Sequence, residues 1–164
     1  MITSLGIIEG YYGRIYTEAE RQSLISFISD TGYSYYIYAP KNDCSLRLKW
    51  DDKFSKEKID FLKRLSLYCK NNSIEFGIGI SPLAITSDLK KYLPILLNKV
   101  DFFVKELKTK VIAILFDDIK LYTDDEGIHQ KEIMNKIASY LASNFPNTNV
   151  RLAFCPTYYS FDPI

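Results

Sequence analysis

The chain has 164 residues, of which 47% are hydrophobic and 15% aromatic, so it carries enough apolar material for a folded core, and a disordered or fibrous protein is excluded. One domain is expected at this length, spanning residues 1–164. Because the chain has 21 basic and 20 acidic residues, its net charge gives no indication of a nucleic-acid or anionic-membrane partner.

The cysteines Cys44, Cys69 and Cys155 lack the spacing of a metal site, and His129 is the only histidine. No metal and no cofactor are therefore expected. The sequence has no uninterrupted apolar stretch of about 18 residues for a membrane-spanning helix. If Met1 is the native start, the lack of a leader-like segment predicts a cytoplasmic protein, and secretion by a leaderless route stays open.

The first part of the chain alternates apolar runs with amphipathic stretches. Ser4–Ile8 predicts a strand, and Thr17 with Glu20 has the spacing of a capping box that begins a helix. Gly32 is typical of a helix end. The aromatic run Tyr35–Tyr38 then predicts a second strand.

The same alternation continues through the middle of the chain. Ser55 is predicted to begin a second helix, which ends at Asn71-Asn72, and Ile74–Ile80 predicts a third strand. A long amphipathic helix follows over Leu89–Leu107, with Pro94 either near its start or at a kink.

The last part repeats the pattern once more. Val111–Phe116 predicts a fully buried strand, Lys120–Gly127 a polar loop, and the region from about Gln130 to Phe145 a helix. A fifth strand is predicted over Val150–Phe154.

Four β-α units and a further strand predict an α/β fold with a parallel sheet covered by helices. An open flavodoxin-like sheet is one alternative. The strand ends carry polar and aromatic residues where that fold has a glycine-rich phosphate loop, and a (β/α)₈ barrel builds its active site at those ends. Since such a barrel needs about 250 residues, we expect a TIM-type barrel truncated to about its first five strands and four helices.

Asp117 and Asp118 are the sharpest chemical feature. Two carboxylates at the end of a buried strand are unfavourable unless they are paired or functional. At close range one tends to stay ionised while its neighbour is driven toward the neutral form, which suits the two carboxyls of a glycosidase. A pair that caps a helix or braces a loop is the structural alternative, and a metal site would need more ligands nearby.

Weaker candidates follow other strands. In Glu9–Arg14, Gly10 would let the backbone approach a ligand and Tyr11 could stack on a sugar, although on chemistry alone an ordinary strand-to-helix turn is the more common explanation of such a motif. Lys41 could donate to a sugar hydroxyl, with a solvated lysine as the alternative. Tyr159 places a hydroxyl near the end of the fifth strand.

Five motifs together resemble glycoside hydrolase family 84, which contains the O-GlcNAcases and bacterial enzymes long called hyaluronidases. The resemblance runs from about Leu5 to Tyr159 and rests on Gly6–Arg14, Tyr36–Asp43, Ile80–Pro82, Leu115–Ile119 and Phe154–Tyr159, which occur in the family's order and spacing.

The resemblance implies a retaining β-N-acetylglucosaminidase in which the substrate's acetamido oxygen is the nucleophile. By position, it implies that Asp117 polarises the acetamido N–H and that Asp118 is general acid and then general base. It matches Gly10 and Lys41 to groups that hold sugar hydroxyls, and Tyr159 to the acetamido pocket. The expected partner is a glycan or glycoprotein that contains N-acetylglucosamine.

The sequence departs from the family at several positions, among them Ile15-Tyr16 in place of Pro-Trp and Leu83 in place of Gly. The last part of the barrel, which supplies an asparagine, an aspartate and a tryptophan, lies beyond Ile164. A truncated, inactive relative that binds sugar weakly is therefore the alternative function. Two open sheet edges also predict self-association.

Overall fold

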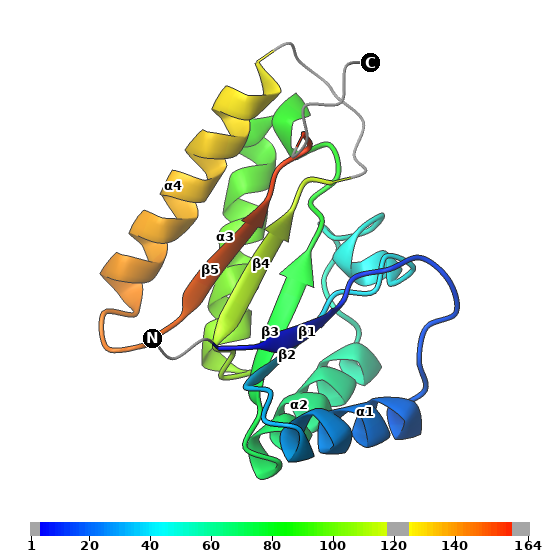
Figure 1. Ribbon diagram of the computed structural model, residues 1–164. Coiled ribbons are helices and arrows are strands. Elements are labelled where there is room, and N and C mark those ends of the chain that lie inside the picture. The colour runs from blue at the N-terminus through cyan, green and yellow to red at the C-terminus, as the bar shows by residue number, and fades with distance from the viewer. Residues whose placement is uncertain (1–3, 118–124, 159–164) are drawn as a thin grey trace.

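A computed structural model describes residues 4–117 and 125–158. Its sheet has five parallel strands in the order β1-β2-β3-β4-β5 (Figure 1). The strands are β1 (Gly6–Glu9), β2 (Tyr35–Tyr38), β3 (Glu75–Ile80), β4 (Val111–Leu115) and β5 (Arg151–Cys155). The helices are α1 (Glu18–Asp30), α2 (Lys56–Asn71), α3 (Leu89–Lys105) and α4 (Glu126–Asn144), with short 3₁₀ helices η1 (Cys44–Leu46) and η2 (Ile85–Ser87).

The sequential strand order confirms the predicted half-barrel of five strands and four helices. A flavodoxin-like sheet would place β1 between β2 and β3, so that alternative is wrong. Each strand is parallel to its neighbour in the chain, from the pairing of Gly6 with Tyr35 to the pairing of Leu115 with Cys155.

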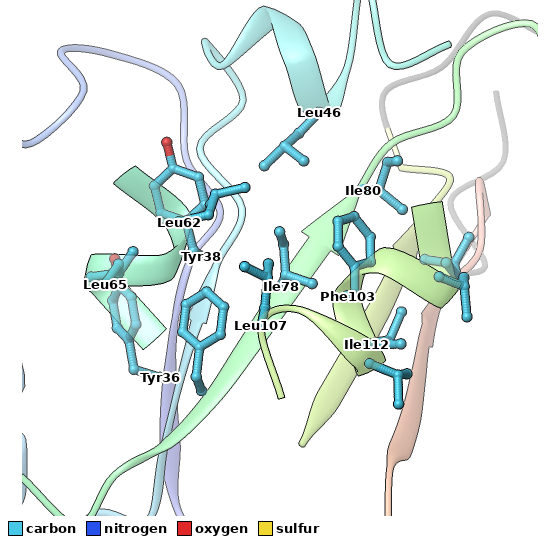
Figure 2. Packing of buried hydrophobic residues seen from close by; sticks show 14 of the residues in the cluster. Tyr36, Tyr38, Leu46, Leu62, Leu65, Ile78, Ile80, Phe103, Leu107 and Ile112 are labelled. Carbon is cyan, nitrogen blue, oxygen red and sulfur yellow. The ribbon is translucent and has the colours of Figure 1, made fainter. Parts of the chain in front are cut away.

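The main core lies between the sheet and the helices, which all cover one face (Figure 1). Alternate strand residues point to this face, and they meet apolar residues of the helices (Figure 2). Its fully or nearly fully buried members include Tyr36, Tyr38, Ile78, Ile80, Leu62, Leu65, Phe103 and Ile112. Burial of this layer is the main source of the fold's stability.

The opposite face of the sheet carries a smaller apolar cluster, to which no helix contributes. It consists of Ile37, Ala39, Val111, Ala113 and Leu115, with Tyr35, Ala153 and Cys155 packed against it. This concave face corresponds to the inside of the barrel. It holds a hollow of about 240 Å³.

Two glycines of β3 lie on the concave face, where there is no room for a side chain. A Cβ atom at Gly79 would lie 2.6 Å from the Cβ of Ala39, and one at Gly77 would lie 2.7 Å from Cγ1 of Ile37. The inner face of the curved sheet therefore needs small residues in β3.

The observed strand boundaries lie within two residues of the predicted ones, and β2 matches its prediction at both ends. A larger difference occurs at the helix α4, which begins at Glu126 rather than near Gln130. The predicted polar loop therefore extends too far toward the carboxyl end. The reason is tertiary, because the buried carboxylate of Glu126 accepts a hydrogen bond of 2.7 Å from the Thr86 hydroxyl of η2. Pro94 lies inside α3.

In the described ranges no helix has the length and apolar character needed to cross a membrane.

Candidate active site

The side chains of Lys41 and Asp117 meet beyond the carboxyl ends of β2 and β4. Strand alternation places Lys41 in phase with Ile37 and Ala39, and Asp117 in phase with Ala113 and Leu115, which belong to the concave cluster. The two polar residues therefore extend the inner face of the half-barrel toward its rim. This rim is where a (β/α)₈ barrel carries its chemistry.

The contact between these residues is a short, largely buried ion pair. Lys41 Nζ donates to Asp117 Oδ2 at 2.5 Å, although the residues are 76 positions apart in the chain. The Lys41 side chain is 3% exposed and that of Asp117 is 18% exposed. The expectation that a lysine here would be solvated is therefore wrong, since the fold buries it against the aspartate.

The second oxygen of Asp117, Oδ1, is not the one that Lys41 contacts. This oxygen is shielded from solvent and has no hydrogen-bond partner among the described residues. A buried carboxylate oxygen in this condition is unfavourable unless something else donates to it. The carboxylate is thus held by a cation through one oxygen and can accept a donor through the other.

The loop after β1 is attached to the loop after β2 beside this pair. The backbone N–H of Lys41 donates to the Tyr11 carbonyl at 3.3 Å, and the Asn42 amide donates to the Gly13 carbonyl at 2.6 Å. Tyr11 is 40% exposed, and its ring packs edge-on against that of Tyr16, with ring centroids 5.5 Å apart. These contacts place Tyr11 next to Lys41 in the fold.

Gly10 continues the concave register of β1. A Cβ atom there would meet only the Ile8 side chain, at 3.3 and 3.5 Å, among the described residues. The backbone of Gly10 therefore lies open toward the inner face, as close approach of a ligand requires.

The carboxylate of Glu9 has a structural role on the other face. It receives two hydrogen bonds from the Arg21 guanidinium, at 2.9 and 2.8 Å, and a third from the Tyr36 hydroxyl. Glu9 and Arg21 are both almost completely buried. The pair fixes the exit of β1 against α1, which in turn places Gly10.

Asp43 is also directed away from the concave face. It accepts hydrogen bonds from the Tyr38 hydroxyl and the Ser45 hydroxyl, both at 2.6 Å, and forms an ion pair with Lys58. Burial by itself raises the pKa of Asp43, but the Lys58 ammonium and these hydrogen bonds keep that pKa below its ordinary value. This cluster shapes the loop that carries Lys41.

Sequence reasoning missed two residues behind Asp117. Gln130 of α4 is 2% exposed, and its amide bonds to Thr157, whose hydroxyl donates to the Phe116 carbonyl at 2.9 Å. A signal was present, because Gln130 lies on the helix stripe of Ile133, Ile137 and Leu141. A polar residue within an apolar stripe indicates a buried hydrogen-bond partner.

Two of the predicted site residues, Asp118 and Tyr159, lie outside the described residues. Within the described ranges, no group of three or more His, Cys, Asp or Glu side chains is arranged to hold a metal ion. The structure thus brings together Lys41, Asp117 and the loop of Gly10 and Tyr11.

Comparison with known proteins finds a family that matches nearly the whole chain. The sequence model of a family described as beta-N-acetylglucosaminidase matches residues 5–162. The proteins named Protein O-GlcNAcase from Rattus norvegicus and Mus musculus are each 33% identical to this chain over 163 residues. The match covers 94% of this chain but 17% of each relative, so the chain spans only a small part of their length.

Solved structures show the same similarity in three dimensions. A mutant of the Thermobaculum terrenum O-GlcNAc hydrolase superposes with a TM-score of 0.85 at 27% identity, over 98% of this chain and 36% of that one. The protein CpGH84B superposes with a TM-score of 0.80 at 27% identity, over 95% of this chain and 27% of that one. From the match along nearly its whole length, the shared half-barrel and the polar rim at its strand ends, this chain belongs to the β-N-acetylglucosaminidase family, glycoside hydrolase family 84.

Proposed function

We propose that this chain is the N-terminal, catalytic part of a retaining β-N-acetylglucosaminidase that removes terminal β-linked N-acetylglucosamine. The observation that carries the proposal is the buried Lys41–Asp117 pair on the inner face of the half-barrel, in which Oδ1 of Asp117 has no hydrogen-bond partner among the described residues. The names of the relatives, which refer to O-GlcNAc, support the sugar as substrate.

Asp117 is suited to the acetamido group of such a sugar. In the proposed first step, the acetamido carbonyl oxygen attacks the anomeric carbon, the glycosidic bond breaks, and a cyclic oxazoline forms. Positive charge grows on the acetamide during this step. A carboxylate that accepts the acetamido N–H stabilises that charge, and Lys41 keeps this carboxylate in place from its other oxygen.

Asp118 is assigned the proton transfers. It gives a proton to the departing glycosidic oxygen, then takes one from the water that attacks the anomeric carbon and reopens the oxazoline. Two inversions at one carbon yield net retention. This scheme is among the exceptions to an enzymic carboxylate nucleophile. Its support here is the position of Asp118 directly after Asp117 in the sequence.

The remaining candidates are assigned to substrate binding. Gly10 and Lys41 contact sugar hydroxyls, Tyr11 flanks the sugar, and Tyr159 lines the acetamido pocket. The partner is a glycan or glycoprotein ending in β-linked N-acetylglucosamine.

The proposed roles of the two aspartates can be distinguished by varying the acidity of the leaving group. In the full-length protein, kcat is measured on aryl N-acetyl-β-glucosaminides with leaving groups of graded acidity. Asp118→Asn should lose most activity on poor leaving groups, which need the proton. Asp117→Asn should lose about two to four powers of ten on all of them, since the acetamide participates in each case.

Two outcomes would contradict this assignment. If the Asp117→Asn deficit disappears as the leaving group improves, the roles of the two aspartates are reversed. If the full-length protein hydrolyses none of the glycosides, the inactive sugar-binding relative is the better description.

A further inference from the structure

The exits of β4 and β5 are joined by a chain of hydrogen bonds that begins on α4. The Gln130 amide Nε2 donates to Thr157 Oγ1 at 2.7 Å, and the Thr157 hydroxyl donates to the Phe116 carbonyl oxygen at 2.9 Å. The Thr157 backbone N–H donates to Gln130 Oε1 at 3.4 Å. Gln130 therefore bonds to Thr157 twice.

The direction of these bonds is fixed by their chemistry. The backbone N–H of Thr157 can only donate, so the side-chain oxygen of Gln130 must face it and the NH₂ group must face the hydroxyl. Because the hydroxyl already accepts from that NH₂ group, its own hydrogen is free to point at the Phe116 carbonyl. A glutamate at position 130 would reverse this order, since it has no hydrogen to donate when ionised.

The carbonyl at the end of this chain belongs to the peptide unit that precedes Asp117. Holding that oxygen fixes the plane of the Phe116–Asp117 peptide and with it the position of the Asp117 Cα atom, from which the side chain extends. The Phe116 backbone N–H is held as well, by the Cys155 carbonyl at 2.8 Å. The Phe116 side chain is completely buried. The carbonyl, the N–H and the side chain of Phe116 are therefore all held in place.

We propose that Gln130 and Thr157 are positioning residues, which orient Asp117 toward Lys41 and the acetamido group through the Phe116 carbonyl. This inference rests on the proposed function for its effect on catalysis. The inference extends the proposed function by giving a positioning role to two residues that do not contact the reacting atoms. The term α4 latch is used for Gln130, Thr157 and the Phe116 carbonyl.

The test uses three variants of the full-length protein. Thr157→Val keeps the shape and removes the hydroxyl, Gln130→Glu keeps the shape and reverses the bond direction, and Thr157→Ser keeps the hydroxyl. We expect Thr157→Val and Gln130→Glu to lower kcat about 10- to 100-fold, the scale of a misplaced reacting group, with KM little changed. Thr157→Ser should stay within about threefold of wild type, because it preserves the bond.

The loss of kcat in the disruptive variants should be equal for good and poor leaving groups, which is the pattern expected for Asp117→Asn. Ser66→Ala is the matched control. It removes a hydroxyl that donates to a backbone carbonyl, that of Leu107, before the amino end of β4 and away from the site. It should lower thermal stability without changing kcat at temperatures where the protein is folded.

Crystal structures of the same variants test the latch without any assay of activity. In Thr157→Val and Gln130→Glu, Asp117 Oδ2 should leave Lys41 Nζ, while Thr157→Ser should keep the 2.5 Å contact. An unchanged contact in all three, or wild-type kcat in both disruptive variants, would overturn the proposal. If wild type itself hydrolyses no glycoside, the proposed function fails, and the crystal structures alone decide the latch.

Discussion

The contact of Lys41 with Asp117 shows how one residue pair determines the candidate site. A lysine and an aspartate that are distant in the sequence come within 2.5 Å because β2 and β4 end at the same rim. Both side chains are largely removed from water, so removing Lys41 would leave the Asp117 carboxylate without the cation that it pairs with. The same ion pair therefore contributes to stability and prepares the carboxylate for a substrate.

Removing one member of this pair should cost more than removing both charges. We expect Lys41→Met to destabilise the protein by up to about 3–5 kcal/mol, because it leaves a mostly buried carboxylate without its cation. Lys41→Met combined with Asp117→Asn should recover part of that loss. Urea denaturation of wild type, both single variants and the double variant gives the coupling free energy. Additive losses would show that the two side chains do not stabilise each other.

At the scale of single elements, local signals fix where the helices begin. The Thr17 hydroxyl accepts from the Glu20 backbone N–H, and the Glu20 carboxylate accepts from the Thr17 backbone N–H, which completes the capping box of α1. Arg14 adds two hydrogen bonds to the same carboxylate, at 2.8 and 2.7 Å. The loop that carries Gly10 and Tyr11 is thereby attached to the start of α1.

The capping box should make α1 sensitive to acid. The hydrogen bonds of Arg14, followed by those of Thr17, lower the pKa of Glu20 from 4.5 to about 2. Since the folded protein holds this carboxylate ionised, its contribution is fully present above about pH 4.5 and is lost as the pH falls toward about 2. Thermal denaturation should find Glu20→Gln less stable than wild type at pH 7.

That difference should close between pH 4.5 and 2. Thr17→Ala provides the comparison, since the loss of a neutral hydroxyl should persist across the same range. A Glu20→Gln deficit that is equally large at pH 2 would contradict the role of the charge.

The strand β3 imposes a different local requirement. Gly79→Ala should destabilise the protein by about 1–3 kcal/mol, because the new methyl group would overlap Ala39 and Leu115. Gly127→Ala is the matched substitution in α4, where a Cβ atom meets none of the described residues within 4 Å. It should be neutral or stabilise by up to about 1 kcal/mol through helix propensity. Urea denaturation of both variants distinguishes these effects, and equal behaviour would refute crowding on the concave face.

At the scale of the whole molecule, the half-barrel leaves its inner face without a second layer. The described residues show no strand beyond β1 or β5 at the two edges of the sheet. Ile8 and Phe154, in these edge strands, are 46% and 45% exposed. Unpaired edges and exposed apolar side chains favour pairing with another chain.

A polypeptide of these 164 residues, expressed by itself, should therefore self-associate or unfold at low denaturant concentration. Sedimentation velocity over a range of protein concentrations measures the association, and urea denaturation measures the cooperativity. A well-folded monomer with one cooperative transition would refute this expectation.

The sequence by itself determined the order and type of the elements. Alternating apolar runs and amphipathic stretches are local patterns, and caps such as Thr17 and Ser55 act within one helical turn. Strand-end motifs were enough to indicate the family, which the comparisons confirm. The start of α4 was placed too late, because the position of Glu126 depends on Thr86, 40 residues away.

Only the tertiary structure decided how the candidate residues are used. Glu9 ends β1 and Lys41 follows β2, yet Glu9 bonds to Arg21 behind the sheet while Lys41 meets Asp117 on the inner face. Alternation along each strand, and the twist that brings separate strand ends together, set these directions. Gln130 and Thr157 escaped sequence reasoning for the same reason. Their bond to the Phe116 carbonyl joins segments that become neighbours only when β4 and β5 pair beside α4.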